Sequence, residues 1–335
     1  MARILITGGA GFIGSQLGYR LHNEGHEVIL VDNMSYGNED NLIVDGKTFG
    51  SFVELDVRND TIFDVMKDVY YVYHFAGIAS LPDCQENPYN TIDNNVAGTA
   101  NVLEAARINN VKRFIFSSTS AVYENNYIYP VKEPTFVFPN LLYSVSKKQS
   151  ELLCTSFTEI YNMPIVMLRF FNVYGPHQDF KRKHPPLINY MIQKLLNNEV
   201  PTFYGDGNQK RDYVYVDDVI DMCKLVINLD GAVGHTFNVS SGKVYSVNEL
   251  YKIVSELIGV EITPTFNKAE TFWDKYESLF SGDYKFNRAR IIKEVNKYCC
   301  GSTDKARITL GWTAKTDIRV GLGDCVNYVK NNLSN

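Results

Sequence analysis

A glycine-rich turn between a short apolar strand and an amphipathic helix constrains the fold of this chain more than any other feature. The turn is Thr7-Gly-Gly-Ala-Gly-Phe-Ile-Gly14, and the predicted helix covers Phe12–Asn23. In such a turn Gly8 permits the tight bend, Gly11 lets the backbone approach a pyrophosphate, and Gly14 lets the helix pack on the strand. The helix N-terminus then offers free N–H groups to an anion. The turn therefore predicts a dinucleotide site.

An acidic residue at the end of the next predicted strand indicates which dinucleotide binds. Asp32 lies 18 residues after Gly14. A carboxylate there accepts both hydroxyls of an adenosine ribose and repels a 2′-phosphate, so NAD is favoured over NADP. Asp56, at the end of the third predicted strand, is a candidate for the adenine amino group, although a helix-capping role explains it almost as well.

Short β-branched runs alternate with helical patterns through the first half of the chain. This alternation predicts an α/β fold with a doubly wound parallel sheet, whose ligands bind beyond the carboxyl ends of the strands. The predicted strands are Arg3–Thr7, Glu27–Asp32, Phe52–Asp56, Tyr70–Phe75, Arg113–Ser118 and Ile165–Phe170. The predicted helices are Phe12–Asn23, Asp60–Met66, Pro88–Ile108 and Tyr143–Tyr161.

The regular alternation of predicted strands and helices stops after about residue 172, and the remaining sequence predicts a smaller C-terminal α/β substrate lobe. Helices are expected over Pro186–Asn198, from near Asp217, and over Leu250–Ile258 after a capping box at Ser246. The stretch 260–302 is expected to be irregular. We assign residues 1–172 and about 210–233 to the cofactor domain, and about 173–209 and 234–335 to the substrate lobe.

Charge and composition exclude several classes of function. Lys and Arg number 33 against 38 Asp and Glu, giving a net charge of −5, which argues against a nucleic-acid partner. No apolar run is long enough to predict a membrane span. The six cysteines form no CxxC pair and no zinc-like cluster, so we expect a reducing, cytoplasmic location and no metal site.

A tyrosine and a lysine four residues apart at the start of a predicted helix are candidates for catalysis. Tyr143 and Lys147 share one helix face, and a neighbouring ammonium is expected to lower the pKa of the phenol from about 10. A phenolate can remove a proton from a sugar hydroxyl while hydride leaves the same carbon. Thr119, in a hydroxyl cluster that ends a strand, could donate to the reacting oxygen. The alternative is an ordinary helix surface and hydroxyls that only satisfy backbone groups.

Taken together, these motifs resemble the extended short-chain dehydrogenases/reductases that act on nucleotide sugars, typified by UDP-galactose 4-epimerase. The resemblance covers nearly the whole chain and implies a Rossmann sheet. The motifs occur in the family's order: the glycine turn, Asp32, Phe75-Ala-Gly77, Asn95-Val-Ala-Gly98-Thr99, Phe116-Ser-Ser-Thr119, Tyr143-x-x-x-Lys147, Arg169-x-x-Asn172-Val-Tyr-Gly-Pro176 and Gly207-x-x-x-Arg211-Asp-Tyr-Val-Tyr-Val-Asp217.

The resemblance implies a role for each matching residue. Tyr143 would be the base, Lys147 would bridge the nicotinamide ribose, and Thr119 would complete the triad. Asn172 and Arg211 would meet the diphosphate, which suits the forked donors of a guanidinium. The remaining expected cofactor contacts are Phe12, Ile13, Asn33, Val57, Phe75, Ala76, Gly77, Asn95 and Phe170, and the remaining expected substrate contacts are Ser80 and Tyr204.

Several positions depart from the family pattern. The 4,6-dehydratases carry Asp-Glu after the triad Thr, where this chain has Ser120 and Ala121, so dehydration is disfavoured. Glu124 stands at a usual glycine and Leu142 at a frequent proline. A phosphate-binding arginine of many members is replaced by Phe280, and an insertion rich in Lys, Arg and Tyr follows it; Arg288 or Arg290 are candidate substitutes.

These features predict an NAD-dependent enzyme of carbohydrate biosynthesis that epimerises a nucleotide sugar, with UDP favoured, at C4. One alternative is another oxidoreductase or lyase on the same scaffold: a dehydrogenase, 4-keto reductase, 2-epimerase, 4,6-dehydratase or decarboxylase, the last with cationic groups around 181–183 for a carboxylate. Another is a catalytically silent dinucleotide sensor. The family resemblance also predicts a homodimer through helices Pro88–Ile108 and Tyr143–Tyr161, with Leu152, Phe157 and Ile160 as candidate contacts.

Overall fold

A seven-stranded parallel sheet forms the centre of the computed structural model, which describes residues 1–180 and 185–333; the basic segment 181–183 lies outside the described residues. The strand order is β12-β8-β7-β6-β1-β2-β5, which confirms the doubly wound α/β prediction. The strands are β1 (Arg3–Thr7), β2 (Glu27–Asp32), β5 (Ser51–Glu54), β6 (Tyr71–His74), β7 (Arg113–Thr119), β8 (Ile165–Phe170) and β12 (Thr236–Val239).

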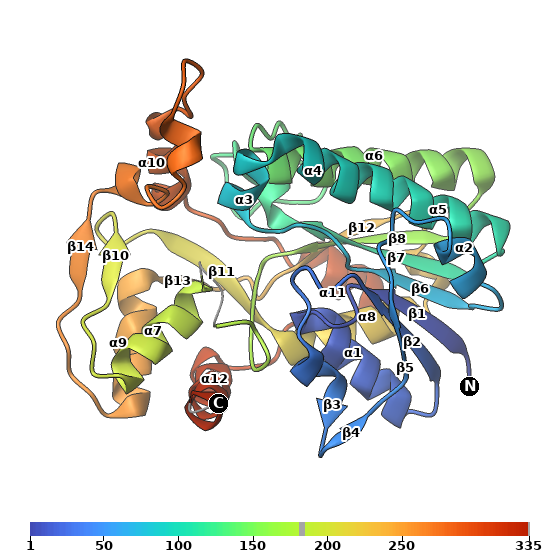
Figure 1. Cartoon of the computed structure of the whole chain (residues 1–335), viewed down its shortest axis with the longest axis horizontal. Helices are drawn as coiled ribbons and strands as arrows, with labels where there is room; N and C mark the ends of the chain where they lie inside the picture. Colours follow the sequence, from blue (N-terminus) through green and yellow to red (C-terminus); the bar gives the residue numbers. More distant parts are fainter. Residues whose placement is uncertain (181–184, 334–335) are drawn as a thin grey trace.

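Both faces of this sheet are covered, as the continuous apolar strands require. In β1, Ile4 and Ile6 belong to one buried cluster and Leu5, between them, to the other. Helices α1 (Phe12–Asn23) and α8 (Val216–Val226) pack together on one side, and α2 (Ile62–Val65), α4 (Pro88–Ile92), α5 (Gly98–Ile108) and α6 (Leu142–Tyr161) cover the other (Figure 1). A short helix, α3 (Leu81–Glu86), follows the end of β6.

The helix expected over Pro88–Ile108 is interrupted by one π-helical turn, Asp93–Ala97, between α4 and α5. This turn contains Asn95, whose side chain is buried. Its amide oxygen accepts from Ile78 N (2.8 Å), and its amide nitrogen donates to Ile78 O (3.0 Å) and Ser146 Oγ (3.0 Å). The turn therefore aims one side chain at the segment that follows β6.

The second lobe is built on small sheets and a group of helices beyond the large sheet (Figure 1). One sheet has the order β13-β11-β9, and β10 pairs with β14. The strands are β9 (Asn172–Tyr174), β10 (Thr202–Tyr204), β11 (Lys210–Tyr215), β13 (Val244–Ser246) and β14 (Thr265–Asn267). The helices are α7 (Leu187–Leu196), α9 (Val247–Ile258), α10 (Arg288–Asn296) and α12 (Ile318–Asn332). Helix α11 (Asp304–Leu310) instead packs against β12 of the large sheet. Outside this lobe, a hairpin of β3 (Ile43–Val44) and β4 (Lys47–Thr48) lies between β2 and β5 in the chain.

Two expectations for the second half need correction. Strand β12 lies in the stretch 234–335 that we assigned to the substrate lobe, yet it pairs with β8 in the large sheet; the rest of the division stays a prediction. The stretch 260–302 is not irregular throughout, since it contains α10 and a buried cluster with Trp273, Tyr276 and Ile291. The capping box at Ser246 is present as predicted.

Within residues 1–180 and 185–333, no helix combines the length and the apolar character needed to cross a lipid bilayer.

Candidate active site

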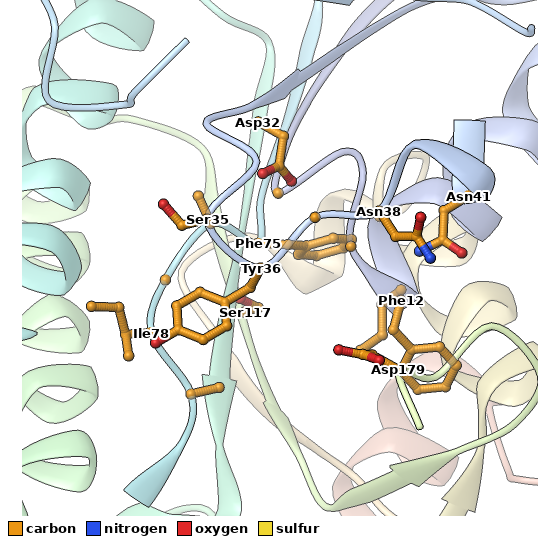
Figure 2. A pocket seen from close by; sticks show the side chains of 18 of the residues that line it. Phe12, Asp32, Ser35, Tyr36, Asn38, Asn41, Phe75, Ile78, Ser117 and Asp179 are labelled. Carbon is orange, nitrogen blue, oxygen red and sulfur yellow. The ribbon is translucent and has the colours of Figure 1, made fainter. Parts of the chain in front are cut away.

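A cavity of about 790 Å³ opens at the carboxyl ends of the central strands. Its walls come from the glycine turn, the loop after β2, the segment after β6, the end of β7 and the start of α6 (Figure 2). Most of the predicted cofactor residues line it: Gly8, Gly11, Phe12, Ile13, Gly14, Asp32, Asn33, Val57, Phe75, Ala76, Gly77, Tyr143, Lys147 and Phe170, together with Thr119. The sequence motifs are thus brought to one place.

The glycine turn is packed too closely for a side chain at Gly8 or Gly14. Gly8 has φ +71°, and a Cβ there would lie 2.8 Å from Ala76 N; a Cβ on Gly14 would lie 2.2 Å from Gly8 O. Helix α1 begins after Gly11, and no side chain caps it. Its first N–H groups therefore stay available to an anion in the cavity wall, as a pyrophosphate requires.

Asp32 is held in place by the backbone on both sides of it. Its carboxylate accepts from Ala10 N (3.1 Å) and Met34 N (3.0 Å). Burial raises the pKa of this carboxyl, and these hydrogen bonds act in the opposite direction. A fixed acceptor at the end of β2 suits the hydroxyls of an adenosine ribose.

Asp56 does not line the cavity and is not free to meet an adenine amino group. Arg58 donates to its two carboxylate oxygens from Nε (2.8 Å) and Nη2 (2.7 Å), and Asn33 donates from Nδ2 (2.9 Å). The hydrogen bonds with Arg58 hold the pKa of the Asp56 carboxyl well below its usual range. Asp56 instead orients Asn33 and Arg58, which do line the cavity.

Asn95 is also set back from the cavity. Its amide is fully used by Ile78 and Ser146, and a Cβ on Gly77 would lie 3.1 Å from its Oδ1. Asn95 therefore shapes the cavity wall from behind, which is a supporting role and not a direct contact.

A second cavity of about 190 Å³ adjoins the first on the side of the substrate lobe. Both cavities are lined by Thr119, Tyr143 and Phe170. The second cavity is further lined by Asn172 and Arg211, as predicted for the substrate, and by Ser120, Ala121, Glu294 and Lys297. The candidate base thus stands at the wall that separates a dinucleotide-sized cavity from a smaller one.

The electrostatics of the tyrosine–lysine pair differ from the prediction. Burial raises the pKa of Tyr143 to about 12, while a hydrogen bond with Thr119 acts in the opposite direction. Burial also lowers the pKa of Lys147 to about 8. The Lys147 ammonium lies 4.4 Å from the centre of the Phe116 ring. The expected lowering of the phenol's pKa by Lys147 is therefore wrong for the protein alone, because burial dominates and the influence that opposes it comes from Thr119.

The guanidinium of Arg211 hydrogen-bonds to backbone carbonyl oxygens. It donates to the carbonyl oxygens of Glu294 (2.8 Å), Val295 (3.1 Å) and Lys297 at the end of α10. Asn172 Nδ2 similarly donates to Asp212 O (2.8 Å). Both residues border the second cavity, and their side-chain donors already bind backbone carbonyls.

The other predicted substrate residues lie elsewhere. Within the described part of the chain, Ser80 and Tyr204 line neither of the two cavities. Ser80 is the residue before α3 and hydrogen-bonds to Tyr276, and the Tyr204 ring packs 4.9 Å from that of Phe272. Of the two candidate arginines, Arg288 pairs with Asp274.

The other candidate arginine, Arg290, pairs with Glu124. Neither arginine lines the second cavity, and the cation that the structure places there beside Arg211 is Lys297.

Sequence reasoning missed one whole side of the large cavity. Residues 35–38 and Asn41 of the loop after β2, residues 177–180, and Tyr328 and Asn332 of α12 complete its walls. The rings of His177 and Tyr328 lie 4.8 Å apart, and His177 also contacts Asn41. Only tertiary packing brings α12 to this cavity, so no local pattern in the sequence marks these residues.

The residues present fit NAD. An uncapped helix N-terminus faces the cavity through a turn that has no room for a side chain at Gly8 or Gly14, and a fixed carboxylate stands at the end of β2. These are the donor and acceptor that a pyrophosphate and an unphosphorylated ribose need.

Comparisons with known proteins agree with this geometry. A model of the NAD dependent epimerase/dehydratase family matches residues 4–240. A putative UDP-glucose 4-epimerase of Methanocaldococcus jannaschii is 34% identical over 98% of this chain and 99% of its own length. The crystal structure of a Thermotoga maritima UDP-glucose 4-epimerase with UDP-glucose has a TM-score of 0.87 and 30% identity, covering 99% of both chains.

Relatives with a different activity match over a similar span. UDP-glucuronic acid decarboxylase 1 of Xenopus tropicalis is 27% identical over 99% of this chain and 73% of its own length. Similarity of the whole chain therefore identifies a family and its cofactor without selecting one reaction.

Proposed function

Because the chain belongs to the NAD-dependent epimerase/dehydratase family, we propose that it inverts C4 of a nucleotide sugar through a transient 4-keto sugar. One observation carries this proposal: Tyr143 and Thr119 line both the NAD cavity and the smaller cavity beside it. A sugar carbon placed between the two would meet a base and the cofactor together. Proximity of this kind is what a hydride and proton transfer at one carbon needs.

The chain's own residues handle the proton and the phosphates. Tyr143, as phenolate, takes the proton from the sugar O4 and later returns it, and Thr119 holds the same oxygen by a hydrogen bond. Arg211 and Lys297 bring positive charge to the smaller cavity, where the diphosphate would lie. When bound, NAD supplies the hydride acceptor and a positive charge in the cavity that Tyr143 lines. That charge opposes the effect of burial on the phenol.

The smaller cavity also argues against dehydration. Ser120 and Ala121, the residues after the triad threonine, both line it. Neither can act as the acid and base that elimination of water requires. Glu294 lines the same cavity, but its carboxylate pairs with Lys297 and Arg290.

Product analysis tests the proposal. The purified protein is incubated with UDP-, GDP-, CDP- and dTDP-sugars, including a uronate, and products are identified by NMR with and without added NAD. We expect the C4 epimer of a UDP-sugar, with no net consumption of NAD. A decarboxylated, dehydrated or accumulated keto product assigns one of the other reactions, and no conversion of any sugar favours a silent sensor.

A Tyr143→Phe variant is the matched control for this experiment. It keeps the ring and removes only the hydroxyl that takes the proton. We expect turnover to be abolished while the protein still folds and retains NAD. Activity near that of the wild type would reject Tyr143 as the base.

We further propose a cytoplasmic role in carbohydrate biosynthesis and a homodimer. All six cysteines are unpaired, which suits a reducing compartment. Leu152 and Ile160 on α6 are exposed, as a helix-to-helix interface would require. Phe157, by contrast, packs against the core beneath α6. The oligomeric state is measured by light scattering, and a Leu152→Glu variant is expected to be monomeric.

A further inference from the structure

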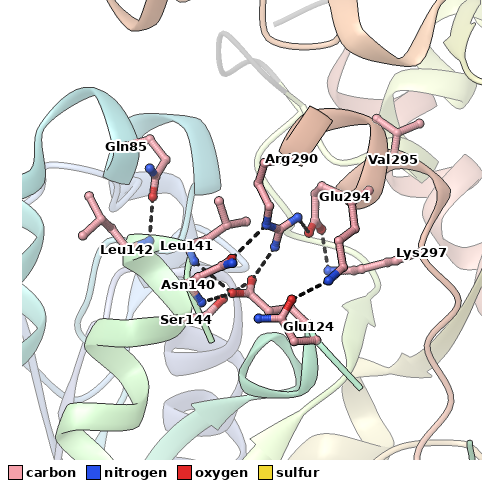
Figure 3. Close-up of polar contacts among 12 residues, drawn as sticks. Gln85, Glu124, Asn140, Leu141, Leu142, Ser144, Arg290, Glu294, Val295 and Lys297 are labelled. Atoms are coloured by element: carbon pink, nitrogen blue, oxygen red, sulfur yellow. Dashed lines mark hydrogen bonds and ion pairs between the residues drawn. The ribbon is translucent and has the colours of Figure 1, made fainter. Parts of the chain in front are cut away.

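A buried carboxylate outside both cavities gathers four donors around the start of helix α6. The side chain of Glu124 accepts from Leu141 N (2.9 Å), Ser144 Oγ (2.9 Å), Arg290 Nη2 (2.8 Å) and Asn140 N (Figure 3). The Glu124 side chain is fully buried, and that of Arg290 is 11% exposed. A buried charge is tolerated only with partners of this kind.

Three of these donors belong to the N-terminus of α6. The helix begins at Leu142, and Leu141, the residue before it, makes no side-chain cap. Glu124 accepts from the two backbone N–H groups just before the helix and from the Ser144 hydroxyl, whereas Gln85 Oε1 accepts from the first helical N–H, that of Leu142 (2.6 Å). The negative charge of Glu124 suits the positive end of the helix dipole. Tyr143 is the second residue of this helix, and Ser144 beside it is bound directly. The position of the phenol therefore depends on Glu124.

The fourth donor belongs to α10 in the substrate lobe. Arg290 also donates to Asn140 Oδ1 (2.9 Å) and pairs with Glu294 (3.3 Å) one turn along its own helix. The end of α10 holds Arg211 through its carbonyls, and Glu294 and Lys297 line the smaller cavity. Helix α10 thus spans from the start of the catalytic helix to the cavity proposed for the sugar diphosphate.

We propose that Glu124 is a positioning residue: through Ser144 and Arg290 it holds the start of α6, with Tyr143, at a fixed position relative to helix α10. This inference rests on the proposed function, since it states how the base and the phosphate-binding residues are held at a fixed distance. Glu124 touches neither cavity and moves no proton. Its effect on the reaction is transmitted through the start of α6 and through α10.

The main test is the Glu124→Gln variant, which keeps the side-chain size and removes the charge and one acceptor oxygen. We expect kcat per NAD-loaded folded molecule to fall on the order of 10²-fold, as for other misplaced catalytic groups, with KM and NAD content within about threefold. Amide hydrogen exchange at residues 141–145 is expected to become faster. A purely structural residue would lower Tm and leave kcat unchanged, and that result would overturn the proposal.

Two further variants keep the test decisive. Arg290→Gln breaks the link between Glu124 and α10 and also removes the weaker pair with Glu294 (3.3 Å). In combination with Glu124→Gln it is expected to add little to the loss. Asp274→Asn is the matched control, because it makes the same carboxylate-to-amide change and removes an ion pair to Arg288 on the same helix without touching α6. Equal losses in Asp274→Asn, additive losses in the double variant, or unchanged exchange at 141–145 would each contradict the proposal.

Failure of the proposed function would be recognised separately. If the wild-type protein converts no sugar, the proposed C4 chemistry is wrong. The role of Glu124 is then tested only by whether Glu124→Gln speeds amide exchange at residues 141–145. If the wild type is active and Glu124→Gln is equally active, only the positioning role is wrong.

Discussion

Replacing Lys147 with methionine should make the folded protein more stable while removing its activity. The Lys147 side chain is buried beneath the NAD cavity, with its ammonium against the face of the Phe116 ring. Burial is the largest influence on the group, and it lowers the pKa from 10.5 to about 8, although Glu151 acts in the opposite direction. A charged group held in such surroundings destabilises the fold that contains it.

The size of the effect follows from the two pKa values. At about 1.4 kcal/mol for each pKa unit, the difference between 10.5 and about 8 corresponds to about 3 kcal/mol. Below pH 8 the lysine is charged in both states, and the native protein bears this cost in full. Between pH 8 and 10.5 the native lysine loses its proton first, so the unfolded state binds more protons and the free energy of unfolding rises with pH. Methionine has a similar length and carries no charge.

Urea denaturation of NAD-free protein measures the effect, followed by fluorescence of the two buried tryptophans, Trp273 and Trp312. We expect Lys147→Met to raise the free energy of unfolding by about 3 kcal/mol near neutral pH. The gain should shrink as the pH rises from 8 toward 10.5 and vanish above 10.5, where wild-type Lys147 is neutral in both states. No gain near neutral pH, or a gain that does not depend on pH, would refute the reasoning.

Three other substitutions test separate parts of the structure. Gly14→Ala places a Cβ 2.2 Å from Gly8 O, so the purified protein should lose its NAD and about 1–3 kcal/mol of stability; retention of NAD would contradict the packing. Glu151→Gln breaks a buried ion pair with Arg169 (2.7 Å) and should lower the free energy of unfolding by about 3 kcal/mol, whereas a loss below about 1 kcal/mol would show that the pair matters little. Asp32→Asn removes the charge that repels a 2′-phosphate. The affinity for NADP relative to NAD should therefore rise about tenfold or more in a binding titration, and an unchanged ratio of the two affinities would exclude that role of Asp32.

The sequence predicts the first half of the fold well because its signals are local. Strands β1 and β2 and helix α1 have the predicted bounds, since apolar residues fill both faces of the strands and a glycine turn fixes where the helix begins. The same turn and Asp32 line one large cavity, as the pattern predicts. These features depend on neighbours within a few residues, which a sequence pattern can capture.

The candidate site is predicted less completely because its details depend on distant packing. Helical spacing correctly puts Tyr143 and Lys147 on one wall, but the pKa of each is set by burial that the spacing does not reveal. Arg211 has the donors for a phosphate, yet it binds the carbonyls of α10, a helix in a stretch that looks irregular in sequence. Glu124 was visible only as an unusual residue at a usual glycine, and its partner Arg290 lies 166 residues away.

The central claim is that hydride leaves and returns at a single sugar carbon beside Tyr143. It is tested most directly with a UDP-sugar that carries deuterium at C4, the label being followed by NMR in the epimerised product. We expect the product to be inverted at C4 and to keep the deuterium there. An inverted product that has exchanged its label for solvent hydrogen, or inversion at a carbon other than C4, would contradict the account.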